Sequence, residues 1–121
     1  MKTLSGGVLL LFLSLMAGPS QAAELVYFWS VTCPICETWD EEVGEIYPKT
    51  EEAKVLPLRR VSIFDDRPED LEFIRGIVYT PTFVAIENGR EIGRIVGYIR
   101  DYFFWWQVGE LVKKMSSPED P

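Results

Sequence analysis

The chain has 121 residues and no histidine, and its 12 Lys and Arg residues against 19 Asp and Glu residues give a net charge of −7 at pH 7. An acidic surface disfavours nucleic acid and anionic membranes, whose phosphate groups attract basic patches. The lack of histidine excludes Ser–His and Cys–His nucleophile pairs and most zinc hydrolases, so two cysteines, the carboxylates and the hydroxyls remain for chemistry.

Residues 1–22 have the layout of a secretory signal peptide. Lys2 precedes an apolar run over residues 8–17, a Gly-Pro pair follows, and Ala22 supplies a small residue at the expected cleavage site. A retained membrane anchor is the alternative, but glycines and a proline interrupt the roughly 20 apolar residues that a spanning helix needs. We therefore expect a mature domain of residues 23–121, periplasmic or secreted, with net charge −8 after the loss of Lys2 and no stable insertion in a membrane.

The mature chain opens with a predicted strand and a predicted helix. Residues 25–29 form a continuous apolar run, which is typical of a strand buried on both faces. The helix is predicted to run from Thr32 or Cys33 to Tyr47, with Pro34 in its first turn. Its apolar positions recur at helical spacing and predict a buried face: Ile35, Cys36, Trp39, Val43, Ile46 and Tyr47.

The later elements are bounded by turn residues. The pattern predicts a strand over 55–64 and then a short helix over 66–76, capped by Asp65 or Asp66. A strand over 82–86, a hairpin turn at Asn88-Gly89 and a strand over 91–96 follow, and the last element is a helix over 101–115. In the last helix, one face is predicted to be core: Phe104, Trp105, Val108, Leu111, Val112 and Met115. The other aromatic residues of that helix, Tyr102, Phe103 and Trp106, are interpreted as padding for a side of the sheet left bare, or alternatively as a docking patch.

The element order β-α-β-α-β-β-α predicts an α/β domain. A strand–helix–strand crossover gives parallel neighbours, and the hairpin then adds an antiparallel pair. We therefore expect a four-stranded mixed sheet with helices on both faces.

The strongest chemical motif is Cys33-Pro34-Ile35-Cys36, at the junction of the first strand and the first helix. Two sulfurs one helical turn apart can close a disulfide, and a helix N-terminus favours a thiolate at Cys33. Cys33, at the exposed end, is therefore the expected nucleophile, and Cys36 is expected to resolve the mixed disulfide.

Three alternatives compete with a redox role for these cysteines. A purely structural disulfide would stabilise little, because the loop it closes is short. A tetrahedral metal site cannot be completed within the chain, since no further Cys and no His is present, which leaves copper(I) on two thiolates. Two reduced core cysteines do not fit an oxidising compartment.

A second motif, Thr80-Pro81-Thr82-Phe83, enters the third predicted strand. Together with Phe28-Trp29-Ser30 before the dithiol, the turn Asn88-Gly89 and Gly97, it makes the chain resemble the thioredoxin superfamily over essentially its whole mature length. The resemblance implies a minimal thioredoxin-like fold, in which Pro81 is a cis-proline packed against the dithiol. It also implies that the backbone of Thr80 pairs with an incoming substrate strand.

Within the superfamily, the short N-terminus and the Gly97-Tyr98 and Asp101–Trp105 segments are most similar to small periplasmic thioredoxins of sulfur-oxidation operons, the SoxS type. That resemblance implies protein thiols or disulfides as partners, among them a thiosulfate-carrier protein. It implies a membrane thiol transporter as electron donor, and no cofactor.

The chain also departs from the familiar thioredoxin pattern. Pro34-Ile35 replaces a Gly-Pro pair between the cysteines, and Tyr27 stands where thioredoxins bury an acid. Glu37 follows Cys36, and its negative charge opposes thiolate formation if it lies near the dithiol; otherwise it is a solvated first-turn residue. Pro34 and Glu37 are thus candidate modulators of the redox couple.

The expected function is a protein-disulfide reductase with a reducing couple at Cys33 and Cys36. An oxidase or isomerase on the same fold is one alternative. A non-catalytic binding module, whose cysteines hold a metal or a closed disulfide, is the other.

Overall fold

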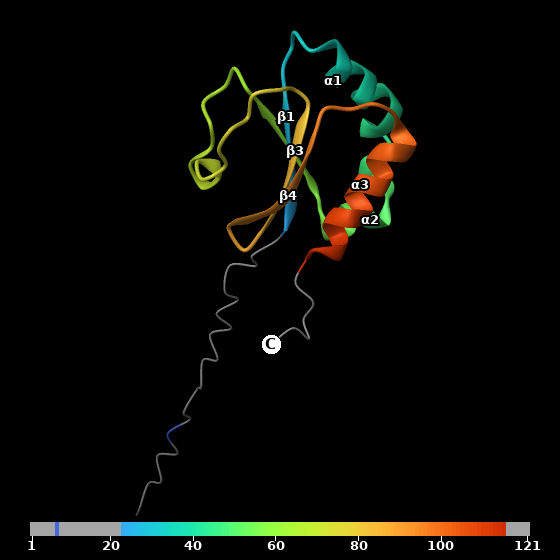
Figure 1. Cartoon of the computed structure of the whole chain (residues 1–121). Coiled ribbons are helices and arrows are strands. Elements are labelled where there is room, and N and C mark those ends of the chain that lie inside the picture. The colour runs from blue at the N-terminus through green and yellow to red at the C-terminus, as the bar shows by residue number, and fades with distance from the viewer. Residues whose placement is uncertain (1–6, 8–22, 116–121) are drawn as a thin grey trace, which may run out of the picture.

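The structure is a computed structural model that describes residue 7 and residues 23–115 (Figure 1). The strands are β1 (Glu24–Trp29), β2 (Leu58–Ser62), β3 (Thr82–Glu87) and β4 (Arg90–Val96), and the α-helices are α1 (Pro34–Trp39), α2 (Glu51–Val55) and α3 (Asp101–Lys113). Apart from residue 7, the predicted signal peptide lies outside the described residues. Within the described part, no helix has the length and apolar character needed to span a bilayer.

The sheet has the order β2-β1-β3-β4. β1 is parallel to β2 and antiparallel to β3, and β3 is antiparallel to β4. This confirms the predicted mixed sheet, with the apolar run of β1 at its centre and residues 25–28 fully buried. The hairpin turn is also confirmed, since Asn88 (φ 54°) and Gly89 (φ 72°) both take the left-handed conformation that such a turn requires.

The first helix is shorter and less regular than predicted. After α1 the chain forms a π turn over Asp40–Gly44 and a 3₁₀ turn over Tyr47–Lys49. A π turn contains more residues than an α-helical turn, so it changes the direction of the side chains that follow. Ile46, which follows the π turn, is 53% exposed although the spacing placed it on the core face. Ile35, in the first turn of α1 and before the π turn, is also 46% exposed, whereas the other four predicted positions are buried.

The second strand begins later than predicted, because residues 51–55 form α2. Thr50 caps this helix, and its hydroxyl oxygen accepts a hydrogen bond from the backbone N–H of Ala53 at 3.2 Å. Val55 therefore ends a helix instead of beginning a strand, and β2 starts at Leu58, after Pro57.

The two faces of the sheet are covered differently (Figure 1). The three α-helices pack on one face, around a core that includes Tyr27, Trp39, Phe83 and Phe104. The other face is covered by residues 63–81, in which the predicted helix is reduced to one 3₁₀ turn over Glu69–Leu71. Leu71 and Ile74 are the side chains of this segment that are buried against the sheet, and Gly76 takes the left-handed conformation with φ 71°.

Helix α3 buries the face predicted from its sequence. Phe104, Val108 and Leu111 are buried, and Trp105, Val112 and Met115 pack against them at the margin of the core. On the outer side, Phe103 stacks on Trp106 with ring centres 5.7 Å apart. Tyr102 and Trp106 remain largely exposed, so these outer rings cover each other more than they cover the sheet.

Strand β4 approaches α3 closely at Gly93, which gives a stability prediction. A Cβ atom at Gly93 would lie 2.6 Å from Cδ2 of Leu111. Gly93→Ala is therefore expected to destabilise the protein by about 1–3 kcal/mol through overpacking. Gly109→Ala is the matched control, because a Cβ at this helical position meets no atom within 4 Å. Removing a glycine from a helix interior is expected to stabilise by about 0.5–1 kcal/mol. Urea denaturation measures both, and equal effects of the two substitutions would contradict the prediction.

Candidate active site

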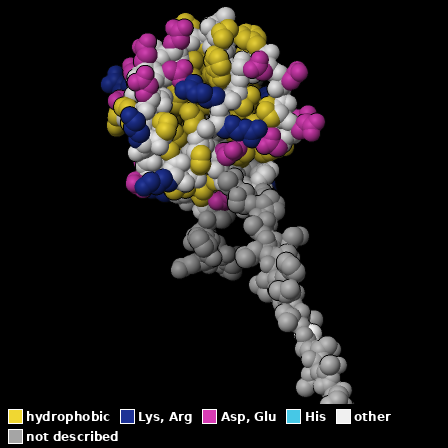
Figure 2. All heavy atoms as spheres, turned by 180° about the vertical axis from the view of Figure 1, so that it is seen from behind, with side chains coloured by type: hydrophobic (Ala, Val, Ile, Leu, Met, Phe, Trp, Pro, Cys, Tyr) yellow, Lys and Arg dark blue, Asp and Glu magenta, His cyan; other side chains and the backbone are white. Residues whose placement is uncertain are grey.

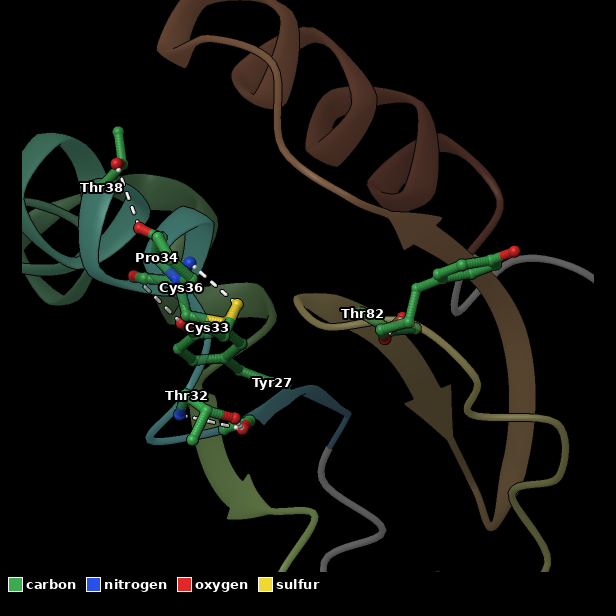
Figure 3. Close-up of a disulfide and its surroundings, with 9 residues drawn as sticks. Tyr27, Thr32, Cys33, Pro34, Cys36, Thr38 and Thr82 are labelled. Atoms are coloured by element: carbon green, nitrogen blue, oxygen red, sulfur yellow. Dashed lines mark hydrogen bonds between the residues drawn. A yellow bond between two sulfur atoms is a disulfide. The ribbon is translucent and has the colours of Figure 1, made fainter.

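The two cysteines lie where β1 ends and α1 begins (Figure 3). They form a disulfide with Cα atoms 5.2 Å apart. Cys33 is the N-cap of α1, and its sulfur accepts a hydrogen bond from the backbone N–H of Cys36 at 3.1 Å. Pro34 occupies the first turn, where a missing N–H costs no helical hydrogen bond. The helix start therefore holds both sulfurs in a fixed geometry.

The turn that delivers Cys33 is held by Ser30. The Ser30 hydroxyl oxygen accepts a hydrogen bond from the Thr32 backbone N–H at 3.1 Å and lies 2.9 Å from the Thr32 hydroxyl. The Ser30 carbonyl accepts from the Cys33 N–H at 3.2 Å. Both cysteines are buried in the disulfide form, Cys33 at 7% and Cys36 at 1% exposure, so Cys33 is the more accessible residue of the two. The assignment of Cys33 as nucleophile and Cys36 as resolving residue stays a prediction.

The Thr80-Pro81 segment enters β3 beside the end of β1, where Thr82 is opposite Phe28 in the strand register. The Thr80–Pro81 peptide bond is cis. The Thr82 hydroxyl donates to the Tyr79 carbonyl at 2.6 Å, and the Gly97 N–H donates to the Pro81 carbonyl at 2.7 Å. Pro81 is buried and Thr80 is half-buried. Both residues thus lie at the sheet edge that carries the dithiol, and their roles in substrate binding stay predictions.

Tyr27 lies directly behind the dithiol (Figure 3). It is fully buried, stacks on Phe83 with ring centres 4.7 Å apart, and donates a hydrogen bond from its hydroxyl to the Cys36 carbonyl at 3.3 Å. Burial raises the pKa of Tyr27, the negative charge of Asp40 adds to this, and Arg60 opposes it. Tyr27 is therefore a neutral hydrogen-bond donor at physiological pH, in the place where thioredoxins have an ionisable acid.

Glu37 is exposed on the first turn of α1, and its backbone N–H donates to the Cys33 carbonyl at 3.3 Å. Its proposed effect on the dithiol stays a prediction. For the metal alternative, the described residues contain no group of three or more His, Cys, Asp or Glu side chains that could hold an ion. Any metal there would have only the two sulfurs of Cys33 and Cys36 as protein ligands of these kinds.

Sequence reasoning did not single out Arg60 and Asp40, which form an ion pair at 2.8 Å beside Tyr27. Arg60 is on β2 and Asp40 is the first residue of the π turn. Their opposite charges were visible in the sequence. The packing of the first helical segment on the sheet brings them together, and the local sequence pattern does not predict that packing.

Exposed apolar side chains gather at the edge of the sheet that carries the dithiol. β1, β2 and β4 end at this edge and β3 begins there. The loops at these strand ends and the first turns of α1 and α3 contribute eight exposed side chains: Val31, Ile35, Ile63, Phe64, Val78, Tyr79, Ile99 and Tyr102. We call these eight residues the apolar border. In Figure 2 the end of the molecule away from the grey segments shows hydrophobic side chains among acidic ones.

A four-stranded α/β domain that presents a disulfide at a helix start, with the Thr80-Pro81 segment at the same sheet edge, is typical of thiol–disulfide oxidoreductases. The sequence matches the family of the thioredoxin-like domain over residues 16–110. The chain therefore belongs to the thioredoxin-like family.

Solved structures agree with this assignment. The periplasmic thioredoxin SoxS from Paracoccus pantotrophus, in its reduced form, is 35% identical with a TM-score of 0.71, over 76% of this chain and 97% of that one. The thioredoxin Mala s 13 of Malassezia sympodialis is 22% identical (TM-score 0.63, 77% of this chain and 80% of that one) and supports the fold alone. No curated protein sequence matches the chain.

Proposed function

We propose that this chain is a periplasmic protein-disulfide reductase that delivers electrons from Cys33 and Cys36 to a disulfide or modified cysteine of a partner protein. The observation that carries the proposal is the similarity to a periplasmic thioredoxin over nearly the whole length of that protein. The predicted signal peptide, residues 1–22, supports the same compartment.

The proposed exchange has two steps. The Cys33 thiolate attacks one sulfur of the partner disulfide, which forms a mixed disulfide and releases the other partner sulfur as a thiolate. Cys36 then loses its proton and attacks the Cys33 sulfur, which closes the intramolecular disulfide and releases the second partner sulfur. Two electrons pass from this protein to its partner. A membrane thiol transporter is the proposed donor that reduces Cys33 and Cys36 again.

The apolar border supports docking of a partner around the dithiol. Its side chains come from the segments that follow β1, β2 and β4 and from the one that precedes β3, so a bound segment could bury several of them together. Burying apolar area contributes roughly 25 cal/mol per Å², which favours a partner segment with apolar side chains next to its disulfide. We infer that the half-buried backbone of Thr80 pairs with this segment, as the thioredoxin resemblance implies.

The reduction potential of the dithiol tests the direction of electron flow. Equilibration with glutathione buffers, followed by thiol alkylation, is expected to give a value nearer to that of thioredoxin, about −270 mV, than to that of the oxidase DsbA, about −120 mV. The protein should also reduce insulin when a small dithiol supplies electrons. A potential near the oxidase value, together with no insulin reduction, would replace the reductase proposal with the oxidase alternative.

A further inference from the structure

A charge pair lies behind the dithiol, on the face of the sheet that α1 covers. Nη2 of Arg60 is 2.8 Å from Oδ1 of Asp40. The Arg60 guanidinium carbon is 5.1 Å from the centre of the Tyr27 ring and 5.9 Å from that of Trp39. Both rings are fully buried. The pair therefore rests on a fixed aromatic surface, and its position does not depend on a mobile loop.

Hydrogen bonds connect this surface to Cys36. The Tyr27 hydroxyl and the Asp40 backbone N–H both donate to the Cys36 carbonyl. Because burial keeps Tyr27 protonated, it contributes a dipole but no charge at physiological pH. Among the described residues, Arg60 and Asp40 are the charged groups that these contacts connect to Cys36.

The space for the pair depends on Gly44, the last residue of the π turn. A Cβ atom there would lie 3.2 Å from Nη2 of Arg60, from Oδ1 of Asp40 and from Cζ3 of Trp39. The π turn and its glycine thus hold the pair against the rings. The outer parts of both side chains contact solvent, which limits their electrostatic effect to a moderate size.

We propose that Arg60 and Asp40 are positioning residues for the second step of the exchange, with opposite effects on how readily Cys36 loses its proton. The guanidinium favours a thiolate at Cys36, and the carboxylate opposes it. Together they nearly cancel, so removing either one exposes the effect of the other. In the described structure the ionisable residues next to Cys36 also include Cys33, the N-cap of α1, Glu37 in the first turn of α1, and the neutral Tyr27 from β1.

This proposal rests on thiol–disulfide exchange at the two cysteines, but not on its direction. Deprotonation of Cys36 releases a proton to solvent, and the thiolate then attacks the Cys33 sulfur. The bond between the two cysteines forms as the bond between Cys33 and the partner sulfur breaks, and the partner leaves as a thiolate. A change in the acidity of Cys36 alters the rate of this step whether the protein reduces or oxidises its partners.

The acidity of Cys36 can be measured alone in the reduced Cys33→Ser protein, by following thiolate absorbance against pH. In this background we expect Cys36 to titrate at higher pH when Arg60 is replaced by Gln, with about threefold to tenfold less Cys36 thiolate at neutral pH. Asp40→Asn should titrate at lower pH, with a comparable gain. The double variant should return close to the parent, and Arg60→Lys, which keeps the charge, should change the thiolate fraction by less than about twofold.

Arg59→Gln is the matched control. Arg59 neighbours Arg60 on β2 but points to the opposite face of the sheet, where it pairs with Glu24 and Asp70. We expect its loss to leave the Cys36 titration unchanged. A merely structural ion pair predicts shifts in the same direction for Arg60→Gln and Asp40→Asn. That outcome, or no shift in either folded variant, would overturn the proposal. If Arg60→Gln does not fold, the titration of Cys36 is compared in Asp40→Asn and Arg60→Lys. A shift to lower pH in Asp40→Asn with little change in Arg60→Lys supports the proposal, and no shift in Asp40→Asn overturns it.

Discussion

Cys33→Ser is expected to reduce disulfide reductase activity to the rate of the uncatalysed exchange, while Cys36→Ser accumulates mixed disulfides with its partners. The reason is the order of the two sulfurs along α1. Cys33 is the cap residue and is 7% exposed, whereas Cys36, one turn further into the helix, is 1% exposed and positioned to attack Cys33. Insulin reduction coupled to a dithiol donor measures the first effect, and non-reducing electrophoresis of the trapped complexes measures the second.

Thr32→Ser serves as the control for the cysteine substitutions. Thr32 lies in the same turn, and serine keeps the hydroxyl that is 2.9 Å from Ser30. Its activity should stay close to that of the parent protein. Full activity of the Cys33→Ser protein would refute the assignment of the nucleophile. Complexes trapped by Cys33→Ser, but not by Cys36→Ser, would reverse the two roles.

Phe104→Ala is expected to cost about 3–5 kcal/mol of the free energy of unfolding, the usual range for removing a buried aromatic side chain. Phe104 is 1% exposed and joins α3 to the sheet. Its ring packs at 4.9 Å from Phe83 and at 5.5 Å from Trp39. Since domains of this kind are stable by only about 5–15 kcal/mol, the loss is a large fraction of the total. Guanidinium denaturation followed by circular dichroism measures it.

Trp106→Ala is the matched control in the same helix. Trp106 is 57% exposed, and its ring stacks on Phe103, which is itself only partly buried. Its removal is expected to change the free energy of unfolding by no more than about 1 kcal/mol. A loss for Phe104→Ala as small as that for Trp106→Ala would show that α3 does not hold the core in the way described.

Much of the architecture could be predicted from local patterns, because those patterns have direct physical causes. The apolar run at residues 25–29 predicts a strand that is covered on both faces, and β1 is such a strand over residues 25–28, while Trp29 at its end is half-buried. Asn88-Gly89 can adopt two successive left-handed conformations, and it forms the hairpin turn. The spacing of Phe104, Val108 and Leu111 places them on one face of α3.

The errors arise where helices are short. A regular 3.6-residue period does not anticipate the π turn at Asp40–Gly44, so it misplaces Ile46. Helix α2 was missed although Thr50 followed by two glutamates is a sequence typical of a helix start. The predicted helix over 66–76 retains only one 3₁₀ turn, because Leu71 and Ile74 can cover the sheet without a full helix.

The site was predictable in its chemistry but not in its surroundings. The two cysteines and Thr80-Pro81 carry recognisable spacing, and they lie at one edge of the sheet. The partners of Tyr27 come from a different strand and from the π turn. The register of β1 against β2 places Arg60 beside Tyr27, and the packing of the first helical segment on these two strands brings Asp40 to Arg60.

The irregular cover formed by residues 63–81 has a consequence for how the protein opens. The strands of the sheet and the three α-helices share one core, whereas this segment is held to the sheet by few buried side chains, chiefly Leu71 and Ile74. Exposed polar contacts add to these, namely the Arg59–Asp70 ion pair and the hydrogen bonds from Arg94 to the carbonyls of Arg75 and Gly76. Segments with few buried contacts open at a lower free energy than the sheet they cover. The Thr80-Pro81 wall of the site belongs to this segment, while Cys33 and Cys36 belong to the helical side. We therefore expect the two halves of the site to differ in local stability, and a partner that contacts both halves to favour the arrangement in which they lie together.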